Sequence, residues 1–89
     1  MTMQTAKTFE EITGTVRFAI QRLYASSPPK DTAHVAQHHA MALGMIIVWA
    51  DLSFDMNGDR AARVQVQDEL EAEVEKFDVQ ARQRLGLPH

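Results

Sequence analysis

The sequence predicts an all-α fold, an up-down-up bundle of three long antiparallel helices. Apolar residues recur at steps of three and four residues over three long segments, which is the spacing of one helix face. Breaks that contain proline or glycine separate these segments, and residues typical of helix caps flank them. Short connections make neighbouring helices antiparallel. We therefore expect residues 1–89 to form a single helical domain that is completed by self-association; the alternative is a hairpin of long helices that pairs with a second copy.

The first helix is expected over residues 8–25. Thr8 and Glu11 have the spacing of a capping box, in which each side chain accepts a hydrogen bond from the other residue's backbone N–H. Pro28 and Pro29 follow the helix and end it, because the residue before a proline is displaced from the helical conformation. The apolar stripe consists of Phe9, Ile12, Val16, Ala19, Ile20 and Leu23.

The second helix is expected over residues 31–56, with Asp31 as a suitable N-cap. It contains the ten-residue apolar run Met41–Ala50, so it has to be covered on more than one side. Two packed seams are predicted. One consists of Val35, His38, Ala42, Met45, Trp49, Leu52 and Met56, and the other of Ala36, Ala40, Leu43, Ile47, Ala50 and Phe54. A row of small residues, Ala36, Ala40 and Gly44, is expected to let the neighbouring helices approach closely.

The third helix is expected over residues 59–85. Gly58 suits the left-handed C-cap of the second helix, and Asp59 suits the N-cap of the third. Gly86 and Pro88 stop the third helix. Its apolar stripe consists of Val64, Leu70, Val74, Phe77, Ala81 and Leu85.

The lengths of the first two helices predict an uncovered surface. If the chain turns at Pro28, Leu23 lies opposite Ala33 and Phe9 lies opposite Ile47, where the first helix has no further residues. The end of the second helix then needs another cover, and aromatic residues and methionine are typical of interface cores. We expect a partner-binding surface formed by Ile47, Trp49, Leu52, Phe54 and Met56, which makes the protein a non-enzymatic interaction module for a partner protein or for itself. The alternative is that residues 1–7 fold back over this end.

A second functional hypothesis rests on the acidic third helix. Its carboxylates are Asp68, Glu69, Glu71, Glu73, Glu75 and Asp78. A solvated helix face is the ordinary interpretation of such a run. The functional alternative is a small inhibitor or regulator whose acidic strip docks on a basic, nucleic-acid-binding surface of another protein.

The histidines offer a third alternative, a metal-binding or catalytic protein. His34 and His38 are four residues apart on a helix, as in two-histidine metal sites, and His39 is adjacent. No third ligand is evident. The helix pairing predicts instead that Asp78 and Arg82 approach His38 and His34, with an Asp78–His38 pair. We therefore expect no metal, no cofactor and no catalytic residue.

Composition limits the classes of partner. The net charge is −3, there is no cysteine and no cluster of basic residues, so we expect neither direct nucleic-acid binding nor membrane binding. The apolar run is too short for a membrane span, and the acidic N-terminal segment is unlike a secretion signal. These features predict a cytoplasmic protein without an evident small-molecule substrate. Arg60 and Arg63 are able to contact an anion, but we expect them to pair with Asp55, Asp59 or Gln67.

Overall fold

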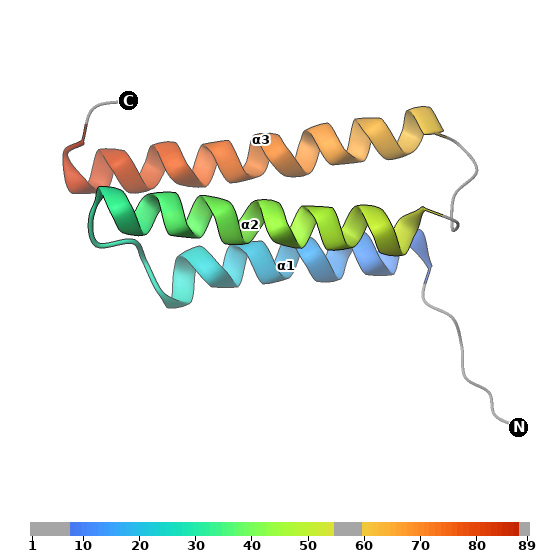
Figure 1. Ribbon diagram of the computed structural model, residues 1–89, viewed down its shortest axis with the longest axis horizontal. Helices are drawn as coiled ribbons and strands as arrows, with labels where there is room; N and C mark the ends of the chain where they lie inside the picture. Colours follow the sequence, from blue (N-terminus) through green and yellow to red (C-terminus); the bar gives the residue numbers. More distant parts are fainter. Residues whose placement is uncertain (1–7, 55–59, 88–89) are drawn as a thin grey trace, which may run out of the picture.

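The computed structural model describes residues 8–54 and 60–87 and is all-α in those residues, which confirms the predicted fold class. It contains three helices, α1 (Phe9–Ser26), α2 (Thr32–Ser53) and α3 (Arg60–Leu85). Each helix runs opposite to the one before it, and α2 packs along both α1 and α3 (Figure 1). Completion of the bundle by self-association stays a prediction.

The helix ends form where the local sequence predicts them, except that α2 ends at Ser53 rather than at residue 56. Thr8 and Glu11 form the complete capping box of α1, with N···O distances of 3.0 Å and 2.8 Å. Asp31 caps α2 by accepting a hydrogen bond from the backbone N–H of His34 at 2.8 Å. Gly86 ends α3 with a φ of 74°, the left-handed conformation that favours glycine. The predicted caps Gly58 and Asp59 lie outside the described residues.

The register between α1 and α2 differs from the prediction. The aromatic ring of Phe9 packs against Trp49 rather than Ile47, with ring centroids 5.8 Å apart. Because α1 ends at Ser26 and α2 begins at Thr32, the turn is centred on the buried Pro29 rather than on Pro28. The facing positions are displaced toward the end of α2, since Tyr24 packs against His38 and Thr13 accepts a hydrogen bond from Trp49, so α1 covers more of α2 than we expected.

One seam of α2 is buried, and it departs from the predicted seam after Ala42. It consists of Val35, His38, Ala42, Ile46, Trp49 and Ser53. With Ile46 and Ser53 in the seam, Leu52 is turned outward and is 56% exposed. The second predicted seam is packed only in part: Leu43 and Ala50 are partly buried against the core, whereas Ala36, Ala40, Ile47 and Phe54 are exposed. The helix is therefore apolar on two sides but covered on one.

The core lies between all three helices. Its fully buried residues come from α1, α2 and α3 and include Ile20, Val35, Ala42, Trp49, Leu70 and Val74. The first part of α3 contributes less than predicted, since Val64 is 49% exposed. Arg17 of α1 forms ion pairs with Glu69 and Glu73 of α3, at 3.9 Å and 3.8 Å, alongside this core.

The small-residue row lies on the uncovered side of α2, contrary to the prediction that it faces α1 and α3. A Cβ atom added at Gly44 would have no heavy atom within 4 Å beyond its own helix. Ala36 and Ala40 are exposed as well. The row therefore makes no close helix contact inside the described part of the molecule.

Replacing Gly44 with alanine is expected to stabilise the monomer by about 0.5–1 kcal/mol, because alanine restricts the unfolded chain and fits the helix without a clash. Urea denaturation of both proteins would measure the difference. Gly14→Ala in α1 is the matched comparison, since that position is also open. A loss of stability at position 44 alone would show that Gly44 packs against another chain.

Candidate functional site

The uncovered side of α2 carries an apolar surface. We call it the free face of α2 and define it by Met41, Gly44, Ile47, Val48 and Leu52. Its four large side chains are 52%, 63%, 54% and 56% exposed, in chain order. These positions recur at steps of three and four residues, so they share one side of the helix. Phe54, just after the helix, is also exposed and borders this face.

Among the predicted partner-binding residues, Ile47, Leu52 and Phe54 are exposed, whereas Trp49 is not. Only 1% of Trp49 is exposed, and its indole Nε1–H donates a hydrogen bond to Thr13 Oγ1 at 2.9 Å. The prediction that Trp49 lies on the uncovered surface is wrong, because the shifted register places α1 directly against it. Met56 and the N-terminal segment 1–7, the alternative cover, lie outside the described residues.

The six acidic residues of α3 do not form one strip. Glu69 and Glu73 pair with Arg17 of α1, and Asp78 is buried at 6% exposure. Asp68, Glu71 and Glu75 remain exposed, and Glu71 accepts a hydrogen bond from Gln67 at 3.1 Å. The prediction that Asp78 belongs to a surface strip is therefore wrong.

Asp78 instead joins all three helices through a hydrogen-bonded cluster, in which Tyr24 and Asp78 are buried and His39 is partly exposed. The hydroxyl of Tyr24 in α1 donates to Asp78 Oδ1 at 2.6 Å. Nδ1 of His39 in α2 lies 2.5 Å from Asp78 Oδ2. Burial raises the pKa of Tyr24 well above its ordinary value of 10.0, and the hydrogen bond and charge of Asp78 and the charge of Glu75 add to the shift. We call these three residues the Asp78 cluster.

His38 does not pair with Asp78, contrary to the prediction. Adjacent helix residues point about 100° apart, so His39 faces α3 whereas His38 faces α1. The His38 ring packs against Tyr24 with centroids 5.3 Å apart. Its Nε2 bonds to the carbonyl oxygen of Ser27, and its Nδ1 lies 3.1 Å from the carbonyl oxygen of His34. His38 thus holds the connection between α1 and α2.

The histidines do not form a metal site in the described residues. No three side chains of the types that bind metals gather there. The rings of His34 and His38 are close, at 4.5 Å between centroids, but both use Nδ1 for backbone groups, since the Lys30 N–H donates to His34 at 3.1 Å. Arg82 lines the shallow groove beside His39 and Asp78, and its positive charge opposes a cation there.

The raised pKa of Tyr24 predicts a loss of stability at alkaline pH. Above about pH 10 the unfolded chain releases the tyrosine proton while the folded chain retains it, so stability that is fully present below pH 10 falls as pH rises, by at most about 1.4 kcal/mol per pH unit. Denaturation of the wild type and of Tyr24→Phe at several pH values measures the difference. Equal slopes in the two proteins would contradict the prediction.

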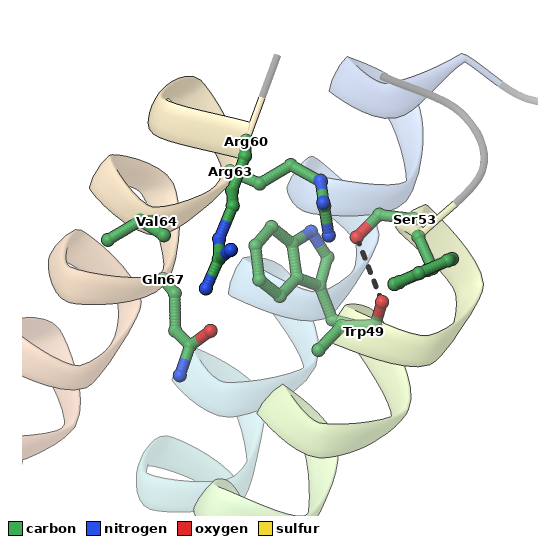
Figure 2. Close-up of a pocket in the computed structure, with 8 residues that line it drawn as sticks. Trp49, Ser53, Arg60, Arg63, Val64 and Gln67 are labelled. Carbon is green, nitrogen blue, oxygen red and sulfur yellow. Dashed lines mark hydrogen bonds between the residues drawn. The ribbon is translucent and has the colours of Figure 1, made fainter. Parts of the chain in front are cut away.

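A groove that the sequence did not indicate lies between the end of α2 and the start of α3. Its volume is about 570 Å³, and it is lined by Trp49, Ala50, Ser53, Phe54, Arg60, Arg63, Val64 and Gln67. Figure 2 shows the side chains of Arg60 and Arg63 extending toward the indole of Trp49. Neither arginine forms an ion pair with a described residue, and Asp55 and Asp59, their expected partners, lie outside that range. We call this the arginine groove.

Comparisons with protein-family models, with curated proteins and with solved structures found no match. Within the described residues, no helix has the length and apolarity needed to cross a membrane. The described residues thus offer three candidate functional features, the free face of α2, the Asp78 cluster and the arginine groove.

Proposed function

We propose that this protein is a small non-enzymatic interaction module that binds a partner protein, or a second copy of itself, through the free face of α2. The observation that carries this proposal is the exposure of four large apolar side chains on one side of a single helix. Single exposed apolar residues are ordinary, whereas a contiguous apolar patch is typical of an interaction site.

The shape of the free face supports a helical partner. Gly44 lies at its centre, with Ile47 and Val48 beside it, and a Cβ at Gly44 would have open space around it. A helix backbone is able to approach such a position closely, because no side chain holds it away. Asp51 is exposed close to Val48 and Leu52, so a partner also has to accommodate one negative charge.

The proposal is tested by placing a charge at the centre of the free face with Val48→Glu. We expect the mass of the wild type, measured by sedimentation, to rise with concentration, and the variant to remain monomeric, because burying an unpaired carboxylate opposes association. Phe18→Glu is the matched control, since Phe18 is an equally exposed apolar residue on α1.

The outcomes separate the two kinds of partner. A wild type that stays monomeric at every concentration excludes the second copy and leaves a different protein as the partner. Phe18→Glu should associate as the wild type does, with itself or with a captured partner. If Val48→Glu also associates in this way, the free face is not the binding surface.

The acidic inhibitor hypothesis has less support. Two of its six carboxylates are paired with Arg17, and Asp78 is inside the bundle. Four carboxylates on α3 are exposed, Asp68, Glu69, Glu71 and Glu75, and of these Glu69 is paired with Arg17. Electrostatic docking through the three others would be weak, because salt screens exposed charges.

A further inference from the structure

The arginine groove combines two positive charges with apolar walls. The guanidinium carbon of Arg63 lies 5.2 Å from the ring centroid of Phe54, and the buried Arg63 Nε–H has no hydrogen-bond partner among the described residues. Arg60 opens onto the same groove. Neither guanidinium group has a carboxylate partner in the described residues.

The residues that line the groove indicate which chemical groups a ligand needs. Phe54 and Val64 supply exposed aromatic and branched apolar surface, the buried Trp49 lies beneath the groove, and Gln67 adds an amide. Guanidinium groups bind planar anions such as carboxylates through paired hydrogen bonds. A volume of about 570 Å³ is within the range of small-molecule sites, which combine apolar walls with a few polar groups.

We propose that the arginine groove binds a small organic acid, with its carboxylate on Arg60 and Arg63 and its apolar body against the exposed side chains of Phe54 and Val64. The positive charges exclude a metal cation from this site. The groove is concave, unlike the free face of α2, so this binding does not require association of the protein with itself or with a partner.

The fluorescence emission of Trp49 allows binding to be measured directly, because Trp49 is the only tryptophan in the chain and lines the groove. The probe is 4-phenylbutanoate, and the signal is tryptophan emission. We expect a saturable change with 4-phenylbutanoate and binding weaker by about tenfold or more with 4-phenylbutanamide, which has the same body but no charge. Acetate, which has the charge without the body, should give no saturable change.

Two variants test the charges. Arg63→Gln and Arg60→Gln are each expected to weaken binding of 4-phenylbutanoate about tenfold, since each removes a charged hydrogen-bond donor. Arg22→Gln is the matched control, because Arg22 also lies over a phenylalanine ring, that of Phe18 at 5.7 Å, but away from the groove. Circular dichroism checks that each variant is folded, and a rise in melting temperature with the acid provides a second reading of binding.

The proposal is overturned if acid and amide bind equally, if no saturable change occurs, or if folded Arg60→Gln and Arg63→Gln bind as Arg22→Gln does. Repeating the titration with Val48→Glu separates it from the proposed function. Unchanged binding in that variant supports an independent small-molecule site. Binding that disappears with Val48→Glu would show that the groove forms only upon association, which contradicts the proposal.

Discussion

Replacing Trp49 with alanine is expected to lower the free energy of unfolding by about 3–5 kcal/mol, a large part of the stability of a small domain. The substitution removes a nearly fully buried indole, its ring contact with Phe9 and its hydrogen bond to Thr13. The cavity left behind borders both α1 and α3. Urea denaturation followed by circular dichroism gives the measurement, since the variant lacks tryptophan emission.

The control for this prediction is the adjacent residue. Val48 is 54% exposed on the free face, so Val48→Ala in the monomer should change the free energy of unfolding by no more than about 0.5 kcal/mol. Similar losses at positions 48 and 49 would mean that the boundary between core and free face is misplaced.

Replacing Asp78 with alanine is expected to cost about 2–3 kcal/mol of stability. The buried Tyr24 hydroxyl would lose its acceptor, and an unsatisfied buried polar group costs about 1–3 kcal/mol. His39 Nδ1 would lose the same acceptor at a smaller cost, because the His39 side chain is 42% exposed to water. Asp68→Ala, on the exposed side of the same helix, should be close to neutral. Chemical denaturation of both variants compares them directly.

A double-mutant cycle makes the prediction about Asp78 specific. Once Tyr24 is changed to phenylalanine, the further loss caused by Asp78→Ala should be smaller, because one of the two groups that needed the acceptor is gone. Strictly additive losses would show that the hydrogen bond between Tyr24 and Asp78 contributes nothing to stability.

Helix boundaries were predictable because their signals are local. The capping box of Thr8 and Glu11, the N-cap Asp31 and the stop at Gly86 each depend on residues within a few positions of one another. The predicted three-helix, antiparallel organisation follows from these boundaries. The end of α2 was predicted at residue 56, whereas the helix ends at Ser53.

The seam of α2 was harder to predict because the helix is apolar on nearly every side. Steps of three and four residues both occur in a buried seam, and a polar residue normally decides between them. Between Ala42 and Trp49 both Met45 and Ile46 are apolar, so the pattern offers no contrast. Packing against α1 and α3 selects Ile46 and then the small Ser53, which leaves Leu52 outside.

The sites formed between helices could not be predicted from the sequence, because they depend on the relative register of the helices, which no local pattern specifies. The choice between His38 and His39 as the partner of Asp78 depends on the orientation of α2 to within one residue. The arginine groove brings Arg63 onto Phe54 across the connection between α2 and α3, and no local pattern indicates that contact.

The Asp78 cluster has a consequence for topology. Three amphipathic helices connected in this order can form a left-turning or a right-turning bundle, and apolar stripes satisfy both almost equally. A buried carboxylate bonded to both Tyr24 of α1 and His39 of α2 favours the arrangement in which α1 and α2 approach Asp78 as they do here. One buried aspartate therefore contributes to selecting this bundle over its mirror topology.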